Sequence, residues 1–106
     1  MQSDPSYRSQ WGELGALKNC LAGYFNQDWA LDYKSVEEAW YAIVREGGAD
    51  HRLRLLEQLD ALLQRSDSDV HVLFRDTADG LYFIEAKDTR HWLEDFQRFL
   101  HSHEPA

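Results

Sequence analysis

The chain has 106 residues, a length that suits one domain with a hydrophobic core and is too short for two. Its 43% hydrophobic content, with 13% aromatic residues, argues against intrinsic disorder. Nineteen acidic and eleven basic residues give a formal net charge of -8, and this negative field argues against direct binding to nucleic acid or anionic membranes. We expect a single domain over residues 1–106, with the polar residues 1–10 as a loose lead-in.

The single cysteine, Cys20, excludes an internal disulfide and lies in an apolar helical pattern, which indicates a small buried residue. No stretch approaches the roughly 18 consecutive apolar residues that a membrane-spanning helix needs. The N-terminus also lacks the basic and then apolar pattern of a signal peptide. We therefore expect a cytoplasmic protein.

Helical periodicity organises the first half of the chain. A first helix is predicted from about Gly12 to Phe25, because leucines recur there at helical spacing. Ser35 followed by Glu38 forms a capping box that begins a second helix. The left-handed conformation of Gly47-Gly48 is expected to end it. The apolar stripe of this second helix consists of Val36, Ala39, Trp40, Ile43 and Val44.

Two further helices are predicted from caps and apolar stripes. Asp50 suits the N-cap of a third helix that reaches Gln64 or Arg65, and Asp88 or Thr89 suits the N-cap of the last. Each has an apolar stripe that should pack into a common core. These stripes consist of Leu53, Leu56, Leu59, Leu62 and Leu63 in the third helix, and of Trp92, Leu93, Phe96, Phe99 and Leu100 in the last.

The segment between them, residues 66–87, fits two structures. As a helix it begins at the capping pair Ser66 and Asp69. As a β-hairpin, residues 70–74 and 81–84 would pair, because β-branched and aromatic residues favour sheet. The residues alone predict a mostly α fold, a helical bundle of four to five helices, with a small β-hairpin near 70–85 (α+β) as the open alternative.

No residues converge into a recognisable catalytic, cofactor-binding or metal site. Cys20 paired with a distant histidine could act as a nucleophile in a hydrolase, but its apolar setting disfavours a thiolate. His101 and His103 have the spacing of a metal pair, yet they lie at a fraying helix end. The residues therefore indicate no metal and no cofactor.

Acidic and aromatic residues occur together between residues 24 and 41, a composition that suits protein recognition. We expect Tyr24, Phe25 and Trp29 to pack inward and to fix the first helix against the second. Asp28 is expected to orient the turn by accepting backbone N–H groups.

These features resemble a family of contact-dependent growth inhibition immunity proteins, CdiI. The most specific part is the string Tyr-Phe-Asn-Gln-Asp-Trp at residues 24–29, which includes Asn26, and the resemblance extends from about Leu14 to Leu100. The matching residues are Tyr24, Phe25, Gln27, Asp28, Trp29, Tyr33, Glu37, Glu38, Leu59, Leu62, Leu63, Trp92 and Leu93.

The resemblance implies a bacterial protein without enzymatic activity that binds the C-terminal toxin domain of a cognate CdiA protein. Binding would be one to one and would occlude the toxin's active site. Such toxins are often nucleases, frequently tRNA-cleaving, and a basic nuclease groove would complement the negative charge of this chain. The resemblance also favours helix over hairpin for residues 66–76.

If family members face different toxins, the shared motif would serve as scaffold, and specificity would lie on acidic residues outside it. The predicted toxin-binding residues are Asp32, Glu37, Glu38, Asp67, Asp69, Asp76, Asp79 and Glu85. A competing interpretation is a small acidic adaptor or regulator that binds some other basic protein, with no direct contact to nucleic acid.

Overall fold

The computed structural model describes residues 14–78, 80–81 and 83–103. This described part contains helices and no strand, so the prediction of a mostly α fold is confirmed. The predicted lead-in at residues 1–10 lies outside it. The described helices are α2 (Gly15–Tyr24), α3 (Trp29–Asp32), α4 (Val36–Leu63), α5 (Asp67–Thr77) and α6 (Ala86–Ser102).

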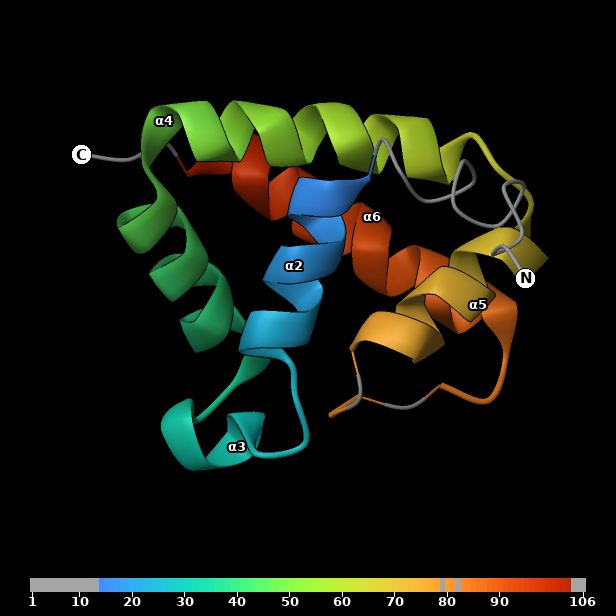
Figure 1. Ribbon diagram of the computed structural model, residues 1–106, viewed down its shortest axis with the longest axis horizontal. Helices are drawn as coiled ribbons and strands as arrows, with labels where there is room; N and C mark the ends of the chain where they lie inside the picture. Colours follow the sequence, from blue (N-terminus) through green and yellow to red (C-terminus); the bar gives the residue numbers. More distant parts are fainter. Residues whose placement is uncertain (1–13, 79, 82, 104–106) are drawn as a thin grey trace, which may run out of the picture.

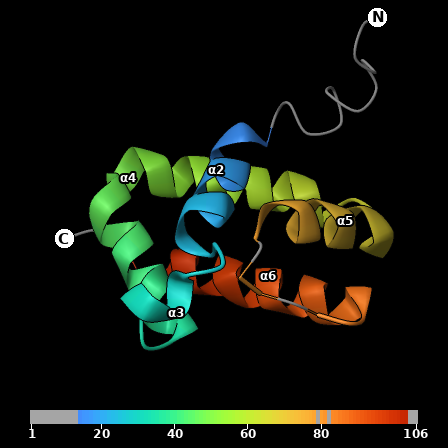
Figure 2. The same ribbon diagram turned by 60° about the horizontal axis from the view of Figure 1, so that its bottom comes forward.

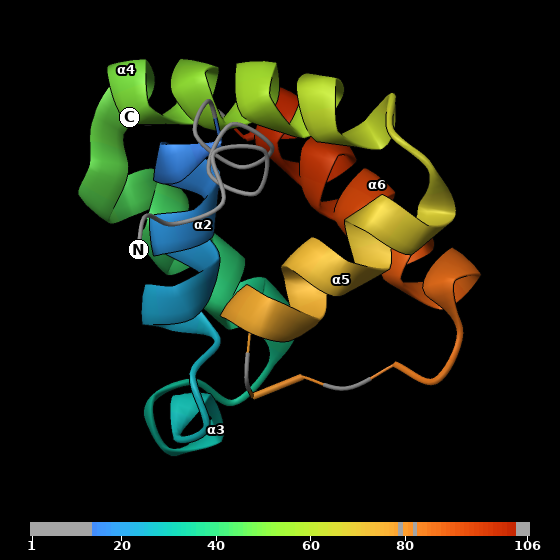
Figure 3. The ribbon, with the colours of Figure 1, turned by 45° about the vertical axis from the view of Figure 1, so that its right-hand side comes forward.

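The helices pack around a shared centre. Helix α2 contacts α4 and α5, and α6 contacts the same two helices from another side. Figure 2 shows α5 and α6 running side by side, with the later part of α4 above them. The short helix α3 and the connection from α5 to α6 both lie at the lower end of the molecule (Figures 1 and 3).

Helix α4 consists of two arms that meet at Gly48, where φ is 78° and ψ is -177°. The predicted end of the second helix at the glycine pair is therefore correct. The predicted N-cap at Asp50 is wrong, because the helix has already resumed at residue 49. A single glycine with positive φ makes the bend, and glycine adopts that conformation without the steric cost that a Cβ imposes.

Two serines begin the helices that the sequence assigned to them. The Ser35 Oγ accepts a hydrogen bond of 3.1 Å from the backbone N–H of Glu38, and Ser66 does the same for Asp69 at 3.1 Å. Both bonds satisfy an N–H that has no partner within its own helix. Residues 67–77 are helical, so the hairpin alternative is wrong for this segment.

The last helix begins earlier than predicted, with Glu85 as its N-cap and neither Asp88 nor Thr89 in that role. Thr89 is fully buried, and its Oγ1 lies 2.8 Å from the Nδ1 of His71 in α5. The hydroxyl that could have capped the helix instead joins α6 to α5.

The core draws on every long helix and is rich in aromatic rings. Trp40 of α4 lies 5.3 Å from Trp92 and 5.4 Å from Phe96, both in α6, measured between ring centroids. One predicted core leucine is misplaced: Leu53 is 56% exposed, whereas Leu55 is fully buried. These two positions are about 200° apart around a helix, so only one can face inward.

Candidate functional site

The stretch Tyr24 to Trp29 packs against distant parts of the chain. The Phe25 ring is fully buried and lies 5.5 Å from the Trp29 ring and 5.1 Å from the Trp92 ring, between centroids. The Trp29 Nε1 donates a 3.0 Å hydrogen bond to the Gly80 carbonyl oxygen, and the Gly80 N–H donates a 2.7 Å bond to the Phe25 carbonyl oxygen. The stretch is thus fixed to α6 and to the segment that follows α5.

Tyr24 has a different role from its neighbours. Its hydroxyl donates a hydrogen bond to the Glu46 carboxylate in α4, and its ring lies 6.2 Å from that of Tyr33. Tyr24 therefore joins α2 to α4, as predicted for all three aromatic residues. For Phe25 and Trp29, the ring contacts and hydrogen bonds found are with each other, with Trp92 of α6 and with Gly80, so their predicted role in holding α2 against α4 stays a prediction.

The turn is oriented by Asn26 and not by Asp28. The Asn26 Oδ1 accepts a 2.9 Å bond from the Asp28 backbone N–H, and its Nδ2 donates to the Gly23 carbonyl at 3.1 Å. Asp28 is exposed, and although it is the N-cap of α3 its side chain makes no capping hydrogen bond. The predicted acceptor role of Asp28 is therefore wrong, because the neighbouring amide already fills it.

Three of the predicted acidic residues lie close together in the chain and are exposed. Asp32 ends α3, and Glu37 and Glu38 form the first turn of α4. Carboxylates in a first turn are favoured by the helix dipole and need no cation nearby. This group lies at the lower end of the molecule in Figure 1, where α3 leads into α4.

Asp67 and Asp69, at the start of α5, differ from this group in their partners and exposure. The Asp67 carboxylate is bound by Arg90, which also donates 2.6 Å bonds to the carbonyls of Leu63 and Arg65. Arg90 thus ties the α4 to α5 connection to α6, and Asp67 has a structural partner. Asp69 is half-buried beside the Ser66 cap.

Asp76 and Glu85 are exposed near the two ends of the α5 to α6 connection. Their ion pairs are long, with 3.9 Å between Asp76 and Arg75 and 3.6 Å between Glu85 and Lys87. Pairs of this kind at the surface contribute little to stability, so both carboxylates can meet a partner. Asp79 lies outside the described residues.

Two exposed aliphatic side chains were missed by sequence reasoning. Leu31 in α3 is 85% exposed, and Ile84, which precedes α6, is 82% exposed. In the sequence, Ile84 belonged to the hairpin alternative, and Leu31 belonged to none of the predicted apolar stripes. A signal existed for Leu31, because Trp29 and Tyr33 face the core and the position midway between them on a helix points away.

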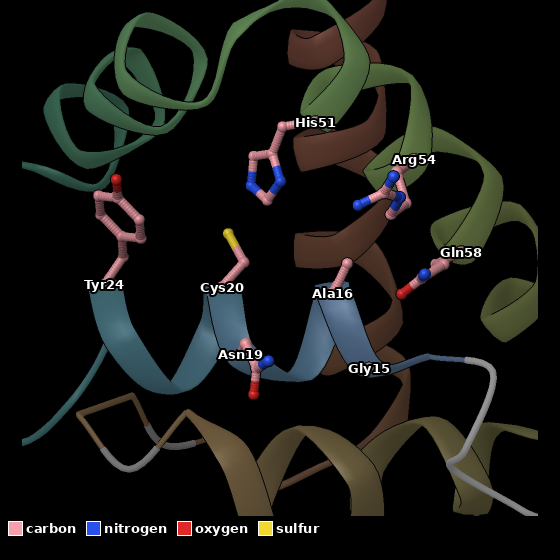
Figure 4. Close-up of a pocket in the computed structure, with 8 residues that line it drawn as sticks. All are labelled: Gly15, Ala16, Asn19, Cys20, Tyr24, His51, Arg54 and Gln58. Atoms are coloured by element: carbon pink, nitrogen blue, oxygen red, sulfur yellow. The ribbon is translucent and has the colours of Figure 1, made fainter.

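A groove of about 580 Å³ lies between α2 and the second arm of α4. Figure 4 shows the Cys20 thiol directed toward His51 across this groove, with Arg54 further along. The structure therefore brings the Cys20 thiol and the His51 imidazole to one groove, whereas the sequence named no particular histidine as the partner of Cys20. Within the described residues no hydrogen bond joins the two groups.

The Cys20 thiol in this groove stays protonated at neutral pH. Cys20 is only 5% exposed, and burial raises the pKa of its thiol to about 12. A thiol with this pKa is a poor nucleophile at neutral pH. Burial and the Glu46 carboxylate likewise raise the pKa of the Tyr24 phenol.

The two histidines near the end of α6, His101 and His103, lie in different environments. His101 is exposed, whereas the His103 ring stacks on Phe99 at 4.0 Å between centroids, and its Nδ1 lies 2.9 Å from the Phe99 carbonyl oxygen. Across residues 14–78, 80–81 and 83–103, no cluster of three or more histidine, cysteine or acidic side chains could hold a metal ion.

Comparison with family models identifies a match over most of the chain. The model of the family described as CdiI immunity protein matches residues 13–100. Neither the comparison with curated proteins nor that with solved structures returns a match. In the described part of the chain, no helix is both long and apolar enough to cross a membrane.

Proposed function

The chain belongs to the CdiI immunity protein family, which neutralises toxins of contact-dependent growth inhibition, and we propose that it does so by covering the active site of a basic nuclease domain. That domain is the C-terminal part of a cognate CdiA protein. The chain acts in the cytoplasm as one domain over residues 1–106, binds its toxin one to one and performs no catalysis of its own. A tRNA-cleaving toxin suits the proposal, since a tRNA-binding groove is basic.

The observation that carries this proposal is the unpaired acidic surface around α3 and the start of α4. Asp32, Glu37 and Glu38 are exposed, and no ion pair to them is found among the described residues. Unpaired carboxylates on an acidic protein raise the rate of association with a basic partner and repel other acidic proteins. They would occupy the positions that substrate phosphates take in the toxin's groove.

The other predicted acidic residues contribute to the proposed toxin-binding surface to different degrees. Asp76 and Glu85 extend the acidic surface along the α5 to α6 connection, where their own ion pairs are long. Asp67 contributes least, because Arg90 already neutralises its carboxylate.

The test is charge reversal at the proposed surface with a control of identical charge change elsewhere. The triple variant D32K/E37K/E38K alters the proposed surface. The control D50K/E57K/D60K alters three exposed acidic residues on the second arm of α4, at the opposite end of the molecule. Binding to the purified toxin domain is measured by calorimetry at two salt concentrations.

We expect the first triple variant to weaken toxin binding by at least about 30-fold, since charge pairs in desolvated interfaces have couplings above 1.5 kcal/mol. The control should weaken it only through the net charge, and added salt should reduce that smaller effect. Equal weakening by both triple variants would show that net charge alone matters and that this surface is not the interface.

A further inference from the structure

We infer that Leu31 and Ile84 are a pair of apolar anchors on which the basic toxin domain docks, one on each side of the junction between Trp29 and Gly80. This inference rests on the proposed function and makes it more specific. It moves the centre of the interface from the first turn of α4 to the edge formed by α3 and the α5 to α6 connection.

Exposure distinguishes these two residues from other apolar side chains. Leu31 and Ile84 are 85% and 82% exposed, whereas Leu53 and Tyr41, the other large exposed hydrophobic residues in the described part, are at 56% and 50%. Scattered exposed hydrophobic residues are ordinary on protein surfaces. Two almost fully exposed aliphatic side chains at one structural junction are a stronger indication of a binding surface.

The junction brings these residues within one interface. Leu31 lies two residues after Trp29 in α3, and Ile84 lies four residues after Gly80, to which Trp29 is hydrogen-bonded. Because a chain spans at most about 3.6 Å per residue, Ile84 lies within about 14 Å of Gly80. A standard interface covers about 800 Å² per partner and is roughly 30 Å across, which is wide enough to span both positions.

Local hydrogen bonds hold the two sides of the junction in place before any partner binds. In α3, the Leu31 N–H donates to the Asp28 carbonyl at 2.9 Å, and on the other side the Leu81 N–H donates to the Ala78 carbonyl at 3.1 Å. The Gly80 N–H bond to Phe25 connects the two sides at 2.7 Å. A surface that is already ordered loses little conformational entropy on binding.

The charge around the anchors selects the class of partner. Residues 26–38 contain four carboxylates and one lysine, a net charge of -3, and residues 75–88 contain four carboxylates, one arginine and one lysine, a net charge of -2. Apolar contacts surrounded by a polar rim are the usual anatomy of a protein interface. The expected partner surface is basic and has apolar depressions that receive one leucine and one isoleucine.

The test uses the full chain with L31A, I84A and the double variant L31A/I84A, with L53A as the matched control. Leu53 is also an exposed leucine, but it lies on the second arm of α4. Affinity for the purified cognate toxin domain is measured by calorimetry. Since exposed side chains contribute little to folding, thermal unfolding should stay unchanged in every variant.

We expect the dissociation constant to rise at least about tenfold in the double variant and less than about twofold in L53A, as for anchor and peripheral residues. If the double variant binds as tightly as the original chain, the inference is wrong while the proposed function stands. If the original chain does not bind the toxin domain, the proposed function itself fails. If the original chain is dimeric and the double variant monomeric, the anchors serve self-association, and that too overturns the inference.

Discussion

The indole Nε1 of Trp29 donates a hydrogen bond to the carbonyl oxygen of Gly80, 51 positions along the chain, at 3.0 Å. This bond joins the most distinctive stretch of the sequence to the segment after α5. A Cβ at position 80 would overlap the carbonyl oxygen of Asn26 and the Cδ1 of Trp29. Glycine is therefore required there because the Asn26 backbone and the Trp29 side chain approach so closely.

The Gly80→Ala variant should lower the free energy of unfolding by about 2–3 kcal/mol, because backbone atoms must move and the Trp29 bond is strained. The matched control is Gly23→Ala in α2, where a Cβ would meet nothing within 4 Å. That control should gain about 0.5–1 kcal/mol from helix propensity. Urea denaturation measures both, and equal stability of the two variants would contradict the close approach at Gly80.

The bend in α4 gives a second prediction. Gly48 has a φ of 78°, a conformation that L side chains rarely adopt. Gly48→Ala should destabilise the protein by about 1–2 kcal/mol, because the Cβ makes this conformation strained. Gly15→Ala, at the start of α2 with open space around its Cα, should be neutral or stabilising. A Gly48→Ala variant with unchanged urea midpoint would show that α4 does not bend at this residue.

Arg90 gives a third prediction, because one guanidinium binds the Leu63 and Arg65 carbonyls and the Asp67 carboxylate. A lysine cannot reproduce this forked geometry. Arg90→Lys should therefore reduce the free energy of unfolding by about 1–2 kcal/mol. The control is Arg98→Lys, since Arg98 makes an exposed pair with Asp95 of little value, about 0.5 kcal/mol or less. Similar losses in the two variants would count against the structural role of Arg90.

The buried thiol of Cys20 predicts a dependence of stability on alkaline pH. Its pKa is about 12 in the folded protein against an ordinary value of 9.0, so both states keep the proton below about pH 9. Between about pH 9 and 12 only the unfolded thiol ionises, and stability should fall by up to about 1.4 kcal/mol per pH unit. The raised pKa values of Tyr24 and Tyr33 add a further fall at higher pH.

The Cys20→Ala variant separates the effect of thiol ionisation on stability from the effect of tyrosine ionisation. Thermal unfolding of both proteins is followed from about pH 8 to about pH 10.5, and the original chain should lose more stability than the variant over this range. Parallel pH profiles would mean that the thiol ionises as easily in the folded protein as in the unfolded one.

Local signals in the sequence predicted most of the fold. The serine caps at Ser35 and Ser66 are satisfied within three residues, so their geometry can be read without knowledge of the tertiary structure. The choice between helix and hairpin after Ser66 was different, because Val70 to Phe74 suits either period. Long-range packing decides it: the Phe74 ring lies 5.1 Å from that of Trp92 in α6.

The candidate surface could be predicted only in part. Charge identified Asp32, Glu37 and Glu38 as exposed, but the partner of Asp67 is 23 residues away and has no local signal. Ile84 is exposed on the connection from α5 to α6, and Gly80 of that connection is bound by Trp29. A sequence does not show such a contact between distant segments.

The most direct test of the central claim is a titration of the cognate toxin domain's activity with this chain. The purified CdiA C-terminal domain is assayed on its nucleic-acid substrate while the chain is added in increasing amounts. Activity should fall to zero at one molar equivalent, and a stable one-to-one complex should be recovered by size-exclusion chromatography. Full toxin activity in the presence of excess chain would contradict the claim.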